Sequence, residues 1–166
     1  MFPSKISHLN PQDAAPRLAG FSIIEVLIVV AIIGLLLSIA SPAYENYVDR
    51  RNYASTTQSL LAIQTAIDRF YVENNRFPES LEDVDLGNLT DAWGTPFYYL
   101  DMATYNRKTS DAKVRRDKKL KPVNSDYDLY SAGKDRKTRA PFTAQESRDD
   151  IVRCNNGRFI GYASEY

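Results

Sequence analysis

The first half of the chain shows two successive apolar patterns. Residues 21–40 form an almost uninterrupted apolar run in which Glu25 is the single charged residue. A helix of about 20 apolar residues is long enough to cross a bilayer. Beyond Pro42, apolar residues recur every three or four positions, which predicts an amphipathic helix that packs on a head domain. This stripe comprises Leu60, Ile63, Ile67, Phe70 and Tyr71. We expect the helix to end near residues 74–75, because the proline that follows disfavours its continuation.

The rest of the sequence predicts a small head. Residues 78–84 are expected to form a short helix, whereas residues 101–124 are polar and basic and indicate no clear element. Three segments have the composition of strands, namely 97–100, 127–131 and 158–162. The predicted fold class is therefore α+β, with a long N-terminal helix packed against a small antiparallel sheet of about three strands.

Glu25 is the unusual residue of the apolar run. A carboxylate at membrane depth costs about 2–3.5 kcal/mol on insertion scales, so its presence indicates a function. One helical turn separates it from Phe21. Cleavage after Gly20 would place a new amine close to this carboxylate, or within reach of the carboxylate of a neighbouring chain.

The start of the chain resembles the class III signal of type IV pilins and type II secretion pseudopilins. The matching positions are Gly20, Phe21, Glu25, Gly34 and Pro42. The resemblance implies cleavage between Gly20 and Phe21 by a prepilin peptidase on the cytoplasmic side, and N-methylation of Phe21. It also implies that Glu25 acts in assembly, together with the helix that carries the glycine and the proline.

The same resemblance implies a division of the chain into three parts. Residues 1–20 would be a leader, residues 21–41 a transmembrane and filament-core helix, and residues 42–166 a periplasmic pilin-like head. The implied protein is a structural subunit of a bacterial type II secretion pseudopilus or type IV pilus-like filament. Its implied partners are the prepilin peptidase, further copies, other pilins or pseudopilins, and an inner-membrane assembly platform. The subunit would be a single-pass inner-membrane protein, and the filament periplasmic or extracellular.

Three other interpretations are weighed against this one. An ordinary secretory signal peptide could be cleaved near residues 41–43, but Glu25 inside the apolar region argues against it. A plain single-pass anchor is long enough, yet it needs no carboxylate. A monomeric membrane-anchored periplasmic binding module could use the basic run at 113–121 as its contact surface. That run lacks the aromatic residues for base stacking, so we expect no nucleic acid, and a solvated loop or pairing with acidic neighbours explains it.

Two motifs in the head resemble the major type II secretion pseudopilin. Residues 91–97 read Asp-Ala-Trp-Gly-Thr-Pro-Phe and resemble the Asp-Pro-Trp-Gly-Asn-Pro-Tyr element of that family. Ala92 replaces the usual proline, and Phe97 replaces tyrosine. Residues 127–135 read Tyr-Asp-Leu-Tyr-Ser-Ala-Gly-Lys-Asp and resemble its Tyr-Asp-Leu-Tyr-Ser-x-Gly-x-Asp element.

In that family the loop after the second motif holds a calcium ion. The resemblance implies Asp135 and one or both of Asp149 and Asp150 as ligands, with backbone carbonyls near Ser131 and Ile151. Calcium takes about six to eight hard oxygen ligands and tolerates an irregular loop. The alternative is that nearby basic residues neutralise these carboxylates as surface ion pairs. Those residues are Lys134, Arg136, Lys137 and Arg139.

The composition excludes several kinds of chemistry. The single histidine, His8, lies in the expected leader, so no histidine-based catalytic pair remains and no enzyme is expected. The single cysteine, Cys154, cannot form an intrachain disulfide, and without histidine it does not make a zinc site. A small buried residue is the expected role of this thiol.

Overall fold

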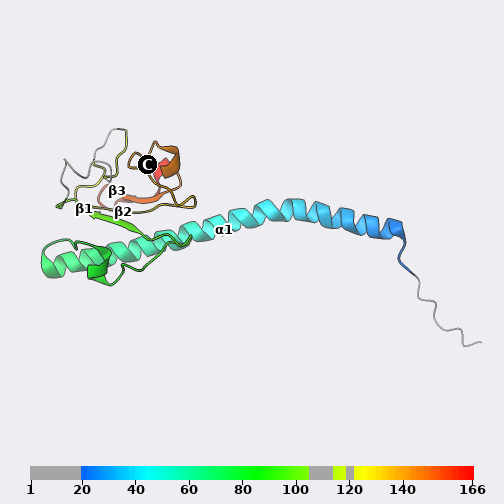
Figure 1. Ribbon diagram of the computed structural model, residues 1–166, viewed down its shortest axis with the longest axis horizontal. Coiled ribbons are helices and arrows are strands. Elements are labelled where there is room, and N and C mark those ends of the chain that lie inside the picture. The colour runs from blue at the N-terminus through cyan, green and yellow to red at the C-terminus, as the bar shows by residue number, and fades with distance from the viewer. Residues whose placement is uncertain (1–19, 105–113, 119–121) are drawn as a thin grey trace, which may run out of the picture. The chain divides into compact units, whose positions relative to one another are not determined.

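The computed structural model describes residues 20–104, 114–118 and 122–166. The chain divides into two compact units, residues 1–43 and residues 44–166. Within the described residues, the main elements are one long helix, α1 (Ile23–Asn74), and one four-stranded sheet (Figure 1). The basic run at 113–121 lies partly outside the described residues, because only residues 114–118 of it are included.

Helix α1 is continuous over 52 residues and contains Pro42. A proline inside a helix removes one backbone donor, but here it does not end the helix. The helix ends at Asn74, which confirms the predicted end at 74–75. Asn75 adopts the left-handed conformation with φ of 53°, and its N–H donates to the carbonyl of Tyr71 at 2.8 Å. Asparagine tolerates this conformation and closes the last turn.

The sheet is antiparallel throughout and has the strand order β1-β2-β3-β4. Its strands are β1 (Tyr98–Asp101), β2 (Tyr127–Ser131), β3 (Ile151–Cys154) and β4 (Phe159–Tyr162). The α+β prediction is confirmed, and the three predicted strands correspond to β1, β2 and β4. The expected number of about three was too low, because β3 was missed. This strand reads Ile-Val-Arg-Cys, and a charged residue inside four residues hides the apolar strand pattern.

Both faces of the sheet are covered in the head. Leu60, Ile63 and Ile67 of α1 pack in one apolar cluster with residues of β2 and β3. Those partners are Tyr127, Leu129 and Ile151. A second cluster contains Tyr130, Phe142, Val152 and Cys154, which confirms the buried position expected for Cys154. Because side chains alternate along a strand, every residue of β2 is buried on one face or the other.

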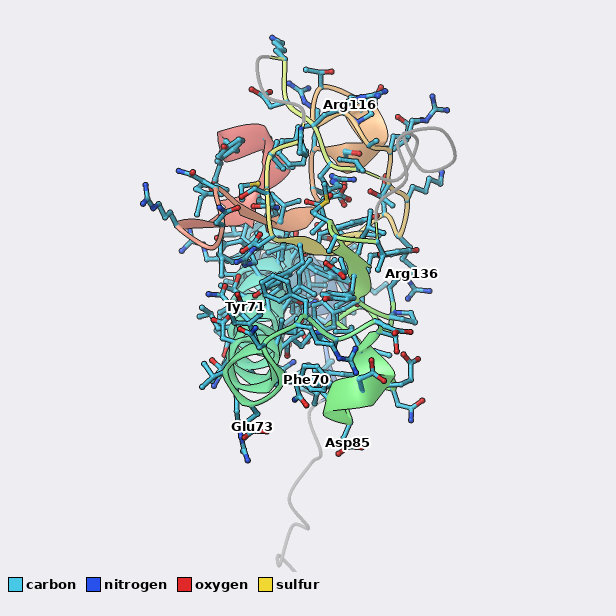
Figure 2. The ribbon with its side chains drawn as sticks, turned by 90° about the vertical axis from the view of Figure 1, so that its left-hand side faces the viewer. Phe70, Tyr71, Glu73, Asp85, Arg116 and Arg136 are labelled. Atoms are coloured by element: carbon cyan, nitrogen blue, oxygen red, sulfur yellow. The ribbon has the colours of Figure 1, made fainter. Side chains whose placement is uncertain are left out.

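Three short 3₁₀ helices complete the described head, η1 (Leu81–Val84), η2 (Gln145–Ser147) and η3 (Ala163–Glu165). The first lies within the helix predicted at 78–84. Phe70 and Glu73 near the end of α1 and Asp85 after η1 lie at the same end of the head and line one hollow (Figure 2). The Tyr71 ring stacks on Phe77 with 4.5 Å between ring centres, so the end of α1 packs against the chain that follows it.

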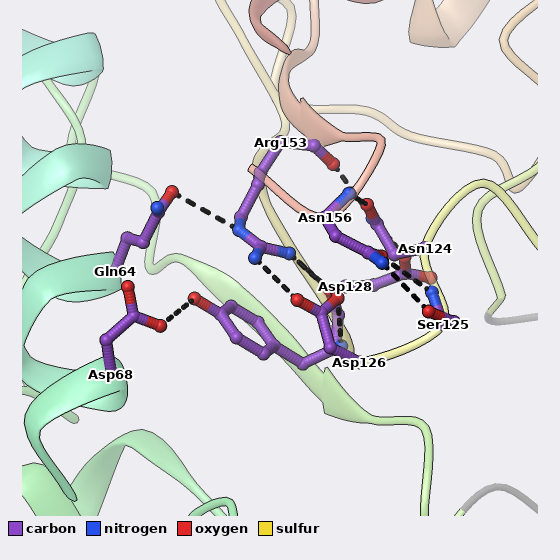
Figure 3. A network of polar contacts seen from close by, with 9 residues as sticks. Gln64, Asp68, Asn124, Ser125, Asp126, Asp128, Arg153 and Asn156 are labelled. Carbon is purple, nitrogen blue, oxygen red and sulfur yellow. Dashed lines mark hydrogen bonds and ion pairs between the residues drawn. The ribbon is translucent and has the colours of Figure 1, made fainter. Parts of the chain in front are cut away.

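A buried arginine links α1 to the sheet. Arg153 of β3 makes a bidentate ion pair with Asp126, with N–O distances of 2.6 and 3.0 Å (Figure 3). Its Nε donates to the side-chain oxygen of Gln64 in α1 at 3.2 Å. The guanidinium carbon lies 3.9 Å from the centre of the Tyr127 ring, and the Tyr127 hydroxyl donates to Asp68 of α1 at 3.3 Å. Polar contacts therefore reinforce the apolar packing of α1.

Candidate functional site

The N-terminal segment places the predicted processing residues just before α1. Gly20 and Phe21 precede Ile23, the first helical residue, and the Phe21 side chain is 81% exposed. No described atom lies within 4 Å of the position that a Cβ on Gly20 would take. The carbonyl of Ser22 accepts the N–H of Glu25 at 3.1 Å, so the helix begins directly after the Gly20–Phe21 bond. Within the described residues, the Gly20–Phe21 bond therefore lies outside the helix in an exposed position.

Glu25 lies in the first turn of α1, where the helix dipole favours a carboxylate. Among the described residues, no basic side chain lies within ion-pair distance of it. The surrounding apolar side chains are exposed, from 82% at Ile23 to 49% at Val29 and Ile33. By length and composition, this part of α1 can cross a membrane. An apolar surface of this size requires lipid or protein to cover it.

The other two predicted assembly residues lie further along the same helix. Space around Gly34 is open, with no described atom near the position of an added Cβ. Pro42 lies close to residue 43, where the first compact unit ends. Their roles in assembly stay predictions.

The first head motif, residues 91–97, forms a turn that makes hydrogen bonds with both α1 and β2. The Asp91 carboxylate accepts two backbone N–H groups of the turn at 2.8 and 2.9 Å, and Gly94 takes a positive φ of 82°. The other carboxylate oxygen accepts the hydroxyl of Ser131 at 2.6 Å. The N–H of Ala92 donates to the hydroxyl of Thr56 in α1 at 3.2 Å. The two head motifs are therefore bonded to each other, and the Ser131 side chain is used in that bond.

The head loop, residues 132–150 between β2 and β3, brings two of the predicted metal ligands together. The backbone N–H of Asp135 donates to the Asp149 carboxylate at 2.9 Å. The Asp135 carboxylate accepts the N–H of Lys137 at 2.7 Å. Gly133 has φ of 66°, and a side chain there would collide with the Asp149 carbonyl. Both carboxylates thus hold the backbone of the loop.

Asp150 has a different environment. It is fully buried, and its Oδ2 lies 2.6 Å from Nη2 of Arg115. The same oxygen accepts the hydroxyl of Thr138 at 2.7 Å. Burial raises the pKa of Asp150 to about 6, although Arg115 and Thr138 oppose the rise. Asp150 is therefore mostly ionised at neutral pH and paired with a guanidinium.

This arrangement does not fit a calcium cage. Calcium needs several oxygens directed at one point. Here Asp150 faces a guanidinium, Asp149 faces a backbone N–H, and Asp135 faces another. The part of the chain that the structure describes contains no group of three Asp, Glu, His or Cys side chains placed to hold a metal.

The alternative prediction was that nearby basic residues form ion pairs with the predicted metal ligands, but two of these basic residues pair with other carboxylates. Lys134 pairs with Asp49 of α1 at 2.8 Å, and Arg139 pairs with Glu146 at 3.1 Å. The cation that pairs with one of the predicted ligands, Asp150, is Arg115. It belongs to the basic run that was interpreted as a solvated loop or as pairing with acidic neighbours, and the pair with Asp150 agrees with the second of these. Sequence reasoning missed it because 35 positions separate Arg115 from Asp150, and no periodic pattern connects them.

The comparison with known families supports the features of the N-terminal segment. Residues 17–41 match the family described as the prokaryotic N-terminal methylation motif. This range includes Gly20, Phe21, Glu25 and Gly34. The apolar helix, the α+β head and this motif define the chain as a pilin-like protein, a class of structural subunits and not of enzymes. The class implies processing by a prepilin peptidase, anchoring in the inner membrane and later assembly into a filament.

Individual relatives refine this assignment. The chain is 27% identical over 121 residues to type II secretion system core protein G of Aeromonas hydrophila. This alignment covers 72% of this chain and 85% of that relative. It is 36% identical over 77 residues to the type IV major fimbrial protein FimA of Dichelobacter nodosus, 46% of this chain and 48% of the relative. It is 45% identical over 49 residues to the type IV major alpha-pilin of Moraxella bovis, 30% of this chain and 31% of the relative. The chain spans about half or less of these two pilins. No solved structure matches it.

Proposed function

We propose that this chain is a structural subunit of a type II secretion pseudopilus. It is cleaved between Gly20 and Phe21, N-methylated on Phe21, and assembled through the apolar part of α1. The subunit waits in the inner membrane with its head in the periplasm, and then enters the filament through an assembly platform together with other pseudopilins.

The extent of the likeness to core protein G supports the choice of a pseudopilus over a surface pilus. An alignment of 121 residues must include much of the head, because the first compact unit ends at residue 43. The likeness to the two type IV pilins above covers less than half of the chain. The bond between Asp91 and Ser131 supports the same choice, because it connects the two head motifs that resemble a pseudopilin.

Glu25 has a physical role in this proposal. The exposed apolar side chains of α1 become buried between subunits, and Glu25 is buried with them. An unpaired buried charge is strongly destabilising, by about 3–5 kcal/mol. The amine that cleavage creates at Phe21 of an adjacent subunit can neutralise this carboxylate. The pair then fixes the axial position of each new subunit, because any other register leaves both charges unpaired.

Processing can be tested separately from assembly. The full chain is expressed with a prepilin peptidase, and the mature N-terminus is read by mass spectrometry. We expect loss of residues 1–20 and the gain of one methyl group on Phe21. Gly20→Leu should block cleavage without disturbing the folded chain, because the space around Gly20 is open. An uncut leader on a protein found only as a monomer would instead support the membrane-anchored binding module.

Assembly is tested with Glu25→Leu, followed by cross-linking of filaments. We expect normal membrane insertion and cleavage but at least about a hundredfold less assembled protein, which corresponds to the loss of a buried pair of about 3 kcal/mol. Glu45→Leu is the matched control, because Glu45 is an exposed acid on the same helix. Normal assembly of Glu25→Leu with unchanged insertion would refute the register role. Filaments on the cell surface instead of in the periplasm would refute the pseudopilus and favour a pilus.

A further inference from the structure

A short segment of the chain, residues 114–118, runs alongside the head loop. Arg116 exchanges two backbone hydrogen bonds, of 3.0 and 3.1 Å, with residues 140–142. The backbone N–H of Arg115 donates to the Asp128 carboxylate on β2 at 2.7 Å. The backbone of Arg115 is therefore held between the sheet and the loop, and its side chain enters the space between them.

The guanidinium of Arg115 is surrounded by oxygen atoms of the head loop. Nη2 binds Asp150 at 2.6 Å, and Nη1 donates to the Thr138 hydroxyl at 2.7 Å and to the carbonyl of Arg139 at 2.6 Å. The side chain is only 2% exposed. One buried cation thus binds a carboxylate, a hydroxyl and a backbone carbonyl, which are the kinds of ligand that a calcium ion takes in a loop.

Two aromatic rings complete the environment of this cation. The guanidinium carbon lies 4.4 Å from the ring centre of Tyr130 and 4.9 Å from that of Phe142. Tyr130 belongs to β2 and Phe142 to the head loop, so the cation contacts the sheet and the loop at once. Such contacts suit the flat, weakly hydrated guanidinium and would not suit a strongly hydrated metal ion.

We propose that the Arg115 guanidinium is the built-in cation of the head loop and takes the structural role that the resemblance assigns to calcium. The loop closes on the sheet through this side chain, without a metal ion and without a disulfide. The proposal concerns the stability of the head, so it does not depend on cleavage or filament assembly.

The Asp150 carboxylate shows what a calcium ion would find at this site. Oδ1 of Asp150 is buried and has no hydrogen-bond partner among the described residues, and the same holds for Nε of Arg115. Asp150 would therefore offer a calcium ion one free carboxylate oxygen, compared with the about six to eight oxygens that the ion takes. The guanidinium already occupies the other oxygen.

The first test is a calcium titration of the full-length protein in detergent micelles. Trp93 is the single tryptophan and lies in the head, so its fluorescence follows unfolding of the head alone. We expect the same Tm in millimolar calcium and in a chelator. A ligand that binds only the folded state must raise the Tm, so a calcium-dependent rise in the wild-type protein would overturn the proposal.

The second test removes the guanidinium and then supplies it again. We expect Arg115→Ala to lower the Tm by about 10 °C or more, because it leaves Asp150 buried and unpaired. Low-millimolar guanidinium chloride should restore part of this loss by filling the vacated space, whereas sodium chloride should not. Arg158→Ala is the matched control, since Arg158 is exposed, and its Tm should stay within about 1 °C of wild type.

A third variant covers the case in which Arg115→Ala does not fold. Arg115→Lys keeps the positive charge but loses the planar set of donors, so it should fold with a Tm below wild type. A wild-type Tm for Arg115→Ala or Arg115→Lys would overturn the proposal, as would a failure of guanidinium to raise the Tm of a folded Arg115→Ala protein.

Discussion

Removal of the Arg153 side chain should destabilise the head more than removal of any exposed charged side chain. The ion pair with Asp126 is nearly buried, with side chains 2% and 20% exposed. Exposed pairs contribute about 0–1 kcal/mol, and breaking a buried pair costs about 3–5 kcal/mol, so we assign about 3 kcal/mol to this one. Loss of the stacking on Tyr127 adds about 1 kcal/mol. Arg153→Ala should therefore lower the free energy of unfolding by about 3–4 kcal/mol.

The assay is urea unfolding of the full-length protein in detergent, followed by Trp93 fluorescence. In thermal unfolding, a matching fall in the Tm of about 10 °C is expected for a domain of this size. The control is Arg69→Ala, because Arg69 is 79% exposed and pairs with the exposed Glu73 of the same helix. That change should cost less than about 0.5 kcal/mol. If Arg153→Ala unfolds within about 1 kcal/mol of wild type, the network in Figure 3 does not hold α1 on the sheet.

A double-mutant cycle separates the ion pair from the packing of the arginine stem. Asp126→Ala alone leaves the Arg153 charge buried, so it should cost about as much as Arg153→Ala. The two changes together should cost clearly less than the sum of the single changes, since residues in one ion pair are coupled. Full additivity would show that the pair contributes nothing and that the loss comes from packing.

Two further predictions concern the core and the pH dependence. Ile63→Ala should destabilise the head by about 2–5 kcal/mol in urea unfolding, because Ile63 is fully buried in the apolar cluster that α1 shares with the sheet. Leu61→Ala at a half-exposed position should cost less than about 1 kcal/mol. The pKa of Asp150 is about 6 in the folded state and 3.8 in the unfolded chain, so the folded state holds the proton more tightly. The contribution of this group to stability therefore falls as pH rises from about 4 to 6. In Arg115→Met the pKa of Asp150 should rise further, so the stability deficit of the variant should grow as pH rises above about 6. A deficit that is constant with pH, measured by urea unfolding, would contradict the pairing of these two residues.

The elements that sequence reasoning predicted are those with a local pattern. The spacing of Leu60, Ile63 and Ile67 predicted the face of α1 that packs on the sheet, and residues 127–131 match β2 completely. These patterns are local because the period of a helix or strand fixes which side chains share a face. The helix end at Asn74 was predicted for the same kind of reason.

The buried arginines could not be predicted in this way. Arg115 and Arg153 bind carboxylates that lie 35 and 27 positions away in the sequence. Only the sheet, with the loop folded over it, brings these groups together. An arginine is usually assigned to the surface when only the sequence is known. The same assumption about Arg153 is the reason that β3 was missed. Asp135 and Asp149, two of the predicted metal ligands, contact each other in one loop, but the cation that meets Asp150 comes from another segment.

The buried thiol of Cys154 offers a direct way to time the opening of the head. It lies in β3 with no exposed surface, and burial raises its pKa to about 12. Thiol reagents react with the thiolate, so the folded head should resist alkylation at neutral pH. Each labelled molecule then records one excursion in which β3 left the sheet. A second cysteine placed at exposed Ser164 would react at once, so the native thiol can stay in place when the subunit is tagged for imaging within a filament.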